Sequence, residues 1–148
     1  MPSIQGAASS LGVKVSAAPV HAKDEIEGVV AAQSRRAGGG LIVMPDGFNL
    51  ANRELIIALA ARYSVPAIYF NVTYFARSGG LISYGPDFTE YFRQAAGYLH
   101  RIFNGANPGE LPIQQPTKFE LVINLKTAKT LGLTIPQTLL LRADRIIE

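Results

Sequence analysis

The chain has 148 residues, of which 48% are hydrophobic and 17% charged, so it can bury a core but has room for only one or two small domains, and a disordered or collagen-like polymer is excluded. It has no cysteine and only two histidines, His21 and His100, which excludes disulfides and thiolate zinc sites and argues against any metal or metal cofactor. Its net charge of +3 comes from scattered basic residues rather than from one basic face, so we do not expect nucleic-acid binding.

The N-terminal third contains one predicted strand and one predicted helix. Val13 and Val15 share one face of residues 13–18, and this alternation predicts a strand. Apolar residues recur at helical spacing over residues 24–36, and the glycines at 38–40 end that helix.

Short apolar strands and a helix follow. Residues 40–44 (GLIVM) are continuously apolar, as expected of a strand that helices cover on both faces. Pro45, Asp46 and Gly47 interrupt it, and Asn49 is placed to cap a helix over residues 50–62. Two more apolar strands are predicted at 66–70 and 80–84.

The clearest predicted helix spans residues 87–103. Asp87 and Glu90 have the spacing of a capping box, and an apolar stripe follows at helical spacing. The stripe consists of Phe88, Tyr91, Phe92, Ala95, Ala96, Leu99, Ile102 and Phe103. After a proline-rich connection, residues 119–125 alternate as a strand, and short helical pieces surround Ala128 and Leu139.

Alternating strands and helices predict an α/β fold with a parallel-dominated sheet and flanking helices, because parallel neighbours need a crossover that a helix supplies. The first ten residues have the character of a helix end that should follow an earlier strand, so we expect the chain to begin in mid-fold. No apolar run reaches the roughly 18 residues of a membrane helix, and the first residues lack the pattern of an export signal.

Polar and aromatic residues follow the predicted strands, where ligands bind in open parallel sheets. They are Asp46, Asn49, Asn71, Thr73, Ser83, Tyr84 and Asp87. This composition suits a small polar ligand with an apolar portion. The alternative interpretation is that Asp46, Asn49 and Asp87 only form turns and cap helices.

Enzymatic interpretations find less support. The sequence has no G-x-S-x-G elbow and no phosphate-binding Walker motif, and GAASSLG lacks the spacing of a dinucleotide-binding loop. VMPDG at 43–47 and Lys126 are similar to elements of response-regulator receivers, but the strand before that loop carries no acidic phosphoacceptor. We therefore expect a protein that is not an enzyme.

From residue 11 onward the sequence resembles the ABC-transporter substrate-binding protein family, whose better-known members bind tryptophan or tyrosine. The matching segments are LGVKV at 11–15, DEIE at 24–27, LIVMPD at 41–46, LAARYSVPAIY at 59–69, GGLISYGPD at 79–87 and QPTKFELVINLKTAKTLGLTIPQTLLLRAD at 115–144. The last segment is long and specific, and the resemblance covers nearly the whole chain.

The resemblance implies a periplasmic-binding-protein-like fold, in which two flavodoxin-like α/β lobes close over a solute and present it to a membrane permease. Residues 1–148 would then be a truncated, C-terminal portion: one lobe plus closing elements of the other. The full-length parent would be periplasmic or on the cell surface, with its signal upstream of these residues. A chain that lacks most of one lobe exposes apolar surface, so we expect it to self-associate.

The resemblance also implies which residues face the cleft between the lobes. An amino-acid solute needs an acid for its ammonium and hydroxyl or backbone donors for its carboxylate, and Asp46 and Ser83 fit these roles. Phe48, Tyr74 and Tyr84 could stack on an aromatic side chain, while Asn49 and Asn71 complete the predicted ligand-binding set. The alternative function is a free-standing flavodoxin-like domain with a signalling or small-molecule enzymatic role.

Overall fold

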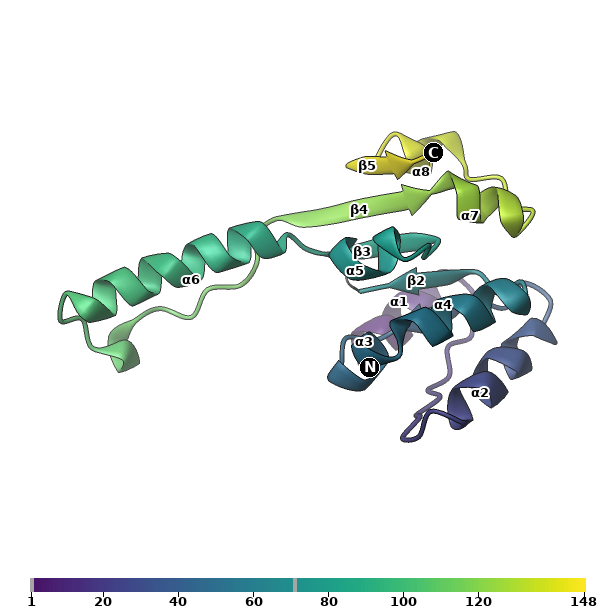
Figure 1. The fold of residues 1–148 in the computed structure, drawn as a ribbon, viewed down its shortest axis with the longest axis horizontal. Coiled ribbons are helices and arrows are strands. Elements are labelled where there is room, and N and C mark those ends of the chain that lie inside the picture. The colour runs from purple at the N-terminus through teal and green to yellow at the C-terminus, as the bar shows by residue number, and fades with distance from the viewer. Residues whose placement is uncertain (1, 71) are drawn as a thin grey trace.

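The structure, a computed structural model, describes residues 2–70 and 72–148, without the side chains of residues 2, 3, 72 and 73. Within these residues, five strands form one sheet in the order β1–β2–β3–β4–β5 (Figure 1). The strands are β1 (Leu41–Val43), β2 (Ala67–Tyr69), β3 (Ile82–Pro86), β4 (Phe119–Asn124) and β5 (Arg145–Ile147). The helices are α1 (Pro2–Ser10), α2 (Glu25–Ser34), α3 (Gly47–Ala51), α4 (Arg53–Arg62), α5 (Val72–Arg77), α6 (Phe88–Phe103), the 3-10 helix η1 (Pro108–Glu110), α7 (Leu125–Thr130) and α8 (Gln137–Leu140).

The sheet is mixed but mostly parallel, which confirms the predicted α/β class. β1, β2 and β3 run parallel, β4 is antiparallel to β3, and β5 is parallel to β4. The carboxyl ends of β1, β2 and β3 therefore meet at one edge, which we call the carboxyl edge. Figure 1 shows that α6 projects away from the sheet on the side of this edge.

The core lies between the sheet and the helices α2, α4 and α5. Ile26 and Val30 of α2 pack with Ile56 and Leu59 of α4 against Tyr69 of β2. Phe75 of α5 is fully buried, and its ring stacks on that of Tyr69 with centroids 4.7 Å apart. Burial of Tyr69 raises the pKa of its hydroxyl strongly, because the charged phenolate is poorly solvated there. This side of the sheet is thus well packed.

α2 and α4 are also joined by a polar contact at the surface. Glu27 of α2 accepts hydrogen bonds from Arg62 Nη1 at 3.0 Å and from the Tyr63 hydroxyl at 2.6 Å. The contact fixes the ends of the two helices relative to each other, at a modest energy because the groups are exposed.

Residues 87–118, which we call the arm, leave the sheet after β3 and return to it at β4. Asp87 caps α6 by accepting hydrogen bonds from the backbone N–H groups of Thr89 and Glu90. Glu90 pairs with Arg93, so only half of the predicted capping box forms. Lys118 Nζ donates to Asp87 Oδ2 at 2.7 Å, and this pair ties the two ends of the arm together.

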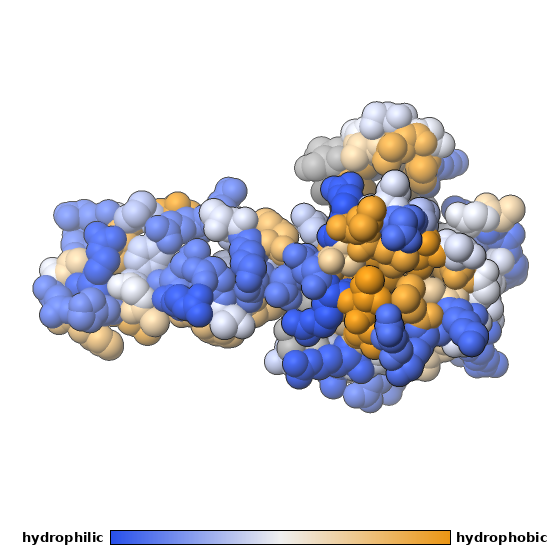
Figure 2. Space-filling model, turned by 90° about the horizontal axis from the view of Figure 1, so that it is seen from above, coloured by the Kyte–Doolittle hydropathy of each residue, from blue (hydrophilic) through white to orange (hydrophobic). Residues whose placement is uncertain are grey.

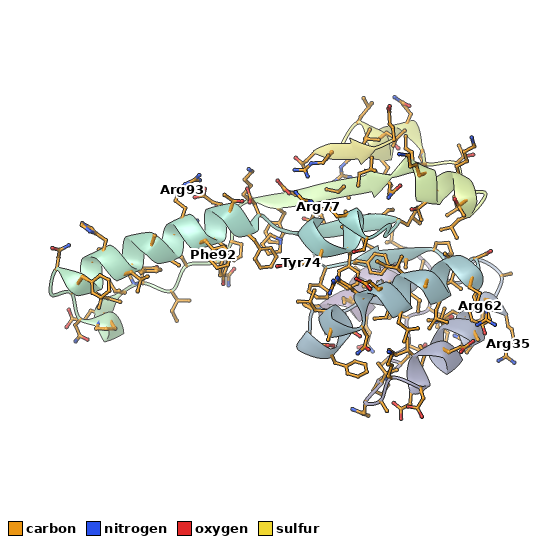
Figure 3. The ribbon with its side chains drawn as sticks, viewed as in Figure 1. Arg35, Arg62, Tyr74, Arg77, Phe92 and Arg93 are labelled. Carbon is orange, nitrogen blue, oxygen red and sulfur yellow. The ribbon has the colours of Figure 1, made fainter. Side chains whose placement is uncertain are left out.

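The apolar stripe of α6 is exposed, although the predicted fold has its helices flanking the sheet, where such a stripe would be buried. Phe92 is 70% exposed and Phe103 83% exposed, and α6 has no buried residue. Figure 3 shows Phe92 and Arg93 on opposite sides of the helix, so the pattern is amphipathic as predicted. The prediction is wrong about the partner, because no part of the described chain covers this face. Figure 2 shows the arm from its hydrophilic side, with hydrophobic residues gathered over the sheet and its helices.

Residues 13–18 are not a strand, although the alternation predicted one. They carry neither helix nor strand, and half or more of Val13 is exposed. A strand is defined by hydrogen bonds to a neighbour, and within the described part of the chain no strand lies beside these residues to supply them.

Three smaller differences concern element boundaries. Asp46, not Asn49, is the N-cap, because the helix begins at Gly47. Residues 50–62 form parts of two helices, which meet at Asn52. β5 was not predicted, since its three residues are too few to show a sequence pattern.

Among the described helices, none is long and apolar enough to span a bilayer.

Candidate ligand site at the carboxyl edge

The loop after β1 is organised around Asp46. Its carboxylate accepts the backbone N–H of Asn49 at 2.6 Å and so caps α3. The Asn49 side-chain amide donates to Asp46 Oδ2 at 2.7 Å and to the carbonyl oxygen of Met44 at 3.0 Å. The turn is therefore closed on itself, and Asp46 and Asn49 do act as the turn and cap residues of the alternative interpretation.

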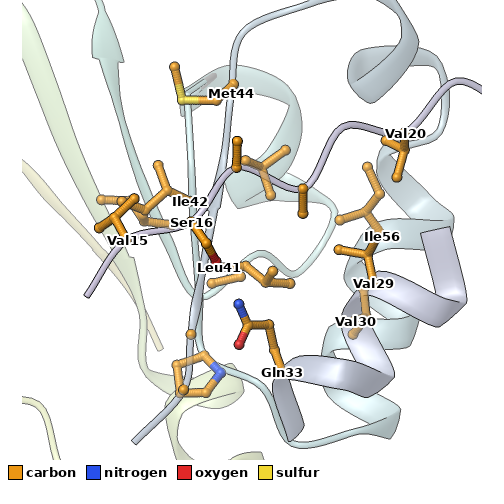
Figure 4. A pocket seen from close by; sticks show the side chains of 18 of the residues that line it. Val15, Ser16, Val20, Val29, Val30, Gln33, Leu41, Ile42, Met44 and Ile56 are labelled. Atoms are coloured by element: carbon orange, nitrogen blue, oxygen red, sulfur yellow. The ribbon is translucent and has the colours of Figure 1, made fainter. Parts of the chain in front are cut away.

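Capping does not exhaust what Asp46 can do. A carboxylate has about four acceptor positions, and the capping contacts occupy part of them. Asp46 is exposed, so a positively charged ligand group could reach the remaining positions without displacing the cap. Asp46, Phe48 and Asn49 line the carboxyl end of a cavity of about 1160 Å³ that continues along β1 (Figure 4).

Arg53 and Tyr74 form a second group at this edge. Arg53 begins α4, and its guanidinium lies over the Tyr74 ring at 5.9 Å from the centroid. Arg53 also donates to the carbonyl oxygen of Leu50 at 3.4 Å and to Glu54 Oε1 at 3.2 Å. Its side chain is 32% exposed, and Tyr74 is 51% exposed. The pair presents a positive charge and an aromatic ring together.

Sequence reasoning missed Arg53. An arginine in the first turn of a helix has no distinctive pattern, because such residues are usually solvated. Its position over Tyr74 depends on the packing of α4 against α5, which brings residues 21 positions apart into contact.

Tyr84 lies at the start of the arm rather than beside Asp46. Its ring stacks on Phe119 of β4 with centroids 5.7 Å apart, and 51% of Tyr84 is exposed. Tyr84 and Phe119 lie on neighbouring strands, β3 and β4, where the arm leaves and rejoins the sheet.

Ser83 is inside the sheet. It pairs in register with Tyr69 of β2 and Val122 of β4, and it is fully buried. Its hydroxyl has no hydrogen-bond partner among the described residues. Ser83 lines neither this cavity nor the smaller one of about 210 Å³ at the base of the arm, as far as the described residues show.

The structure thus brings together part of the predicted site. Asp46, Phe48 and Asn49 share one wall, Tyr74 and Tyr84 lie on other elements, and Ser83 is buried away from them. Asn71 lies outside the described residues. No group of three His, Cys, Asp or Glu side chains able to hold a metal ion occurs in the described part of the chain.

Comparison with known proteins decides the family. The model of a family described as ABC transporter substrate-binding protein matches residues 2–147. The chain belongs to this family. Among curated proteins, none is similar enough in sequence to count as a match.

Solved structures agree with the fold of this family. A conserved domain protein from Vibrio cholerae O1 biovar El Tor is 26% identical, with a TM-score of 0.86 over 98% of this chain and 48% of its own. An ABC domain from Streptococcus pneumoniae in complex with L-Trp is 23% identical, with a TM-score of 0.87 over 99% of this chain and 49% of its own. A ligand-free, open substrate-binding protein with adhesive properties from Clostridium difficile is 16% identical, with a TM-score of 0.68 over 99% of this chain and 48% of its own. The chain spans about half the length of each of these three proteins.

Proposed function

We propose that this chain is part of a solute-binding protein that binds a small amino-acid-like solute at the carboxyl edge. The observation that carries the proposal is the placement of Asp46, Arg53 and Tyr74 at this edge in a chain of the substrate-binding family. A carboxylate, a guanidinium and an exposed ring match the ammonium, the carboxylate and an apolar side chain of such a solute. The bound L-Trp in the related Streptococcus structure supports this solute class.

Each group has a defined role in the proposal. The Asp46 carboxylate binds the ammonium and the Arg53 guanidinium binds the carboxylate, since arginine holds carboxylates with paired hydrogen bonds. Tyr74 and the half-buried Phe48 contact the apolar side chain of the solute. We assign the carboxylate to Arg53 rather than to Ser83 because the Ser83 hydroxyl is buried.

The chain supplies only part of the binding surface. The matched structures are about twice as long, so a second lobe would close over the solute and contribute the remaining contacts. We therefore expect the 148-residue chain to bind weakly, with a Kd on the order of 1 mM.

The remaining parts of the proposal follow from membership of the family. The whole protein would act without catalysis in an importer, on the outer side of the membrane, and would deliver its solute to a membrane permease. Independently of the family, the exposed apolar face of α6 leads us to expect that the chain alone self-associates. The family match favours this class over a free-standing flavodoxin-like signalling or enzyme domain.

An NMR titration of the ¹⁵N-labelled chain with L-Trp, L-Phe and L-Leu tests the proposal. We expect shifts at the amides of Asp46, Asn49 and Arg53. Asp46→Asn keeps a good N-cap but removes the negative charge, so it separates solute binding from helix capping. It should abolish most of the amide shifts that the amino acids cause. Asp24→Asn is the control for the loss of one negative charge, because Asp24 precedes α2, away from the carboxyl edge, and its side chain makes no capping hydrogen bond.

Two solute analogues assign the roles. Tryptamine lacks the carboxylate, so Arg53→Gln should leave its affinity unchanged, whereas indole-3-propionate lacks the ammonium and should be indifferent to Asp46→Asn. Arg62→Gln is the control for Arg53, since Arg62 lies over the Tyr63 ring at the other end of α4. Absence of any shift at the carboxyl edge, or equal effects of Asp46→Asn and Asp24→Asn, would overturn the proposal.

A further inference from the structure

The smaller cavity lies at the base of the arm, beside the carboxyl end of β3. Its volume is about 210 Å³, and polar groups from four elements line most of it. Arg77 ends α5, Asp87 and Thr89 lie at the start of α6, Glu120 lies in β4 and Arg145 lies in β5. Figure 3 shows Arg77 where the arm meets the sheet. The cavity is separate from the loop after β1, since β2 lies between β1 and β3.

The sheet register brings Glu120 and Arg145 to one face of the sheet. Val122 of β4 pairs in register with Arg145, and Glu120 lies two residues before Val122, so the three side chains share a face. Ala76 of α5 packs with Val122 on this face, and the next residue, Arg77, lines the cavity. Two guanidinium groups and one carboxylate from distant parts of the sequence therefore meet at one place.

The Asp87 carboxylate is already occupied by contacts within the arm. Its Oδ1 atom accepts the backbone N–H groups of Thr89 and Glu90, and its Oδ2 atom accepts Lys118 Nζ at 2.7 Å. The neighbouring Glu90 carboxylate is paired with Arg93. Because these charges offset one another, Asp87 forms a wall of the cavity and is not needed to bind a ligand.

The other three charged groups of the cavity have no such contacts. In the described part of the chain, neither Arg77, Glu120 nor Arg145 makes a side-chain hydrogen bond or an ion pair. Glu120 is half-buried and the two arginines are exposed. With Asp87 and its partner Lys118 counted, three cations face two carboxylates, so the cavity has a surplus of one positive charge. Such a surplus attracts an anion.

We propose that this cavity binds a small dicarboxylic amino acid, of the size of aspartate or glutamate, as a second ligand of the chain. Its two carboxylates pair with the guanidinium groups of Arg77 and Arg145, and its ammonium pairs with the Glu120 carboxylate. The single net negative charge of such a ligand offsets the surplus positive charge of the cavity. All three unpaired side chains thereby gain a partner of opposite charge.

Other ligand classes match the cavity less well. A neutral amino acid has only one carboxylate, so it leaves one guanidinium unpaired. A simple dicarboxylate has no ammonium, so it places two negative charges beside Glu120, and like charges in contact oppose binding. The cavity offers little apolar surface to an aromatic side chain, so its ligand differs from the solute proposed for Asp46 and Arg53.

An NMR titration of the ¹⁵N-labelled 148-residue chain at constant ionic strength tests the proposal. Three probes are compared: L-aspartate, L-asparagine, which has one carboxylate fewer, and succinate, which has no ammonium. We expect L-aspartate to shift the amides of Thr89, Glu120 and Arg145 with a Kd on the order of 1 mM. L-Asparagine and succinate should bind about tenfold more weakly or worse, since each leaves a charged group unpaired.

Two arginine variants locate the carboxylate contacts. Arg77→Gln and Arg145→Gln should each weaken binding of L-aspartate about tenfold, because each removes a charged hydrogen-bond donor. Arg142→Gln is the matched control, since Arg142 is exposed near β5 but does not line the cavity. It should leave the affinity for L-aspartate unchanged.

Glu120→Gln tests the ammonium contact by reversing the preference. It removes the partner of the ammonium and also the repulsion of a second carboxylate, so it should weaken L-aspartate and strengthen succinate. A gain in affinity for succinate cannot come from a misfolded variant. Glu110→Gln, at the exposed end of η1, should change neither affinity.

Three results would overturn the proposal. They are equal shifts with L-aspartate and with chloride, which would indicate a general salt effect, binding of L-aspartate that survives both arginine variants, and an unchanged order of L-aspartate and succinate in Glu120→Gln. The titration with L-Trp above is read at Asp46, Asn49 and Arg53. Failure of that solute site and failure of the dicarboxylate site are therefore separately visible.

Discussion

α4 and α6 both carry apolar residues at helical spacing, but the two helices lie in different environments. α4 packs on the sheet and buries Ile56, Leu59 and Ala60. α6 has the clearer apolar stripe in sequence and buries no residue. Apolar spacing thus identifies the face of a helix that needs cover, but it does not tell whether the cover lies within the same 148 residues. The core and the arm should therefore respond differently to the same substitution.

Two phenylalanine substitutions give the largest expected contrast. Phe75→Ala removes a fully buried ring that stacks on Tyr69 and contacts Phe70, so the free energy of unfolding should fall by about 3–5 kcal/mol. Phe92→Ala removes a ring that is 70% exposed, and it should change stability by less than about 0.5 kcal/mol. Urea denaturation at low protein concentration measures both. A similar loss for Phe92→Ala would mean that the arm folds back on the core in solution.

Self-association should depend on the arm. The double variant Phe92→Ser and Leu99→Ser replaces two exposed apolar side chains of α6, each worth about 1.5 kcal/mol or more if buried between copies, so dimerisation should weaken about 100-fold or more. Sedimentation velocity over a range of concentrations measures this. Arg93→Ser, on the opposite side of the helix, is the control. A chain that stays monomeric at all concentrations contradicts the prediction.

Much of the fold could be predicted because its signals are local. The apolar strands at β1, β2, β3 and β4, the helix α6 and its cap at Asp87 all follow from spacing within a few residues. The strand predicted at residues 13–18 was wrong, because a strand also needs a neighbouring strand and the spacing of apolar residues does not reveal one. Burial of the apolar stripe of α6 could not be predicted for the same reason, since burial depends on a part of the protein that packs against the stripe.

The candidate site was less predictable than the fold. Position after a strand identified Asp46 and Asn49, because chain direction fixes which edge of a parallel sheet those residues reach. Position after a predicted strand also placed Ser83 at the carboxyl edge. Ser83 instead lies within β3, and its side chain is buried on the face of the sheet that α5 covers. Arg53 could not be found this way, because its relation to Tyr74 comes from helix packing.

Ser83→Ala tests the burial of this hydroxyl inside the core. An unpaired buried hydroxyl costs roughly 1–3 kcal/mol, so removing it should raise the free energy of unfolding by about 1 kcal/mol. Ser34→Ala, on the exposed surface of α2, should have little effect. If Ser83→Ala instead weakens binding of L-Trp without changing stability, Ser83 contacts the solute as the sequence suggested.

The smallest predicted effect concerns the pH dependence of the arm at its base. The hydrogen bond from Lys118 lowers the pKa of Asp87 below its usual 3.8, with further lowering by the N–H groups of Thr89 and Glu90. Because this pKa is lowered, the ionised Asp87 stabilises the folded base of the arm at any pH above the usual pKa. The stabilisation is lost as the pH falls through the lowered pKa. Asp87 raises the pKa of Lys118, so the stabilisation from the charged Lys118 is fully present at a pH below the usual lysine pKa. It is lost as the pH rises through the raised pKa.

Loss of the Lys118–Asp87 pair should affect only the arm, because the arm has few contacts with the core. In Lys118→Met the Asp87 carboxyl should titrate at a higher pH than in the wild type, as followed by NMR of its side-chain carbon, and the amides of Thr89 and Glu90 should exchange faster. The urea midpoint of the core should stay unchanged. Lys126→Met, on α7, should alter neither reading. An unchanged Asp87 titration in Lys118→Met would show that the pair does not hold the arm in solution, whereas a shifted midpoint of the core would show that the arm and the core unfold as one unit.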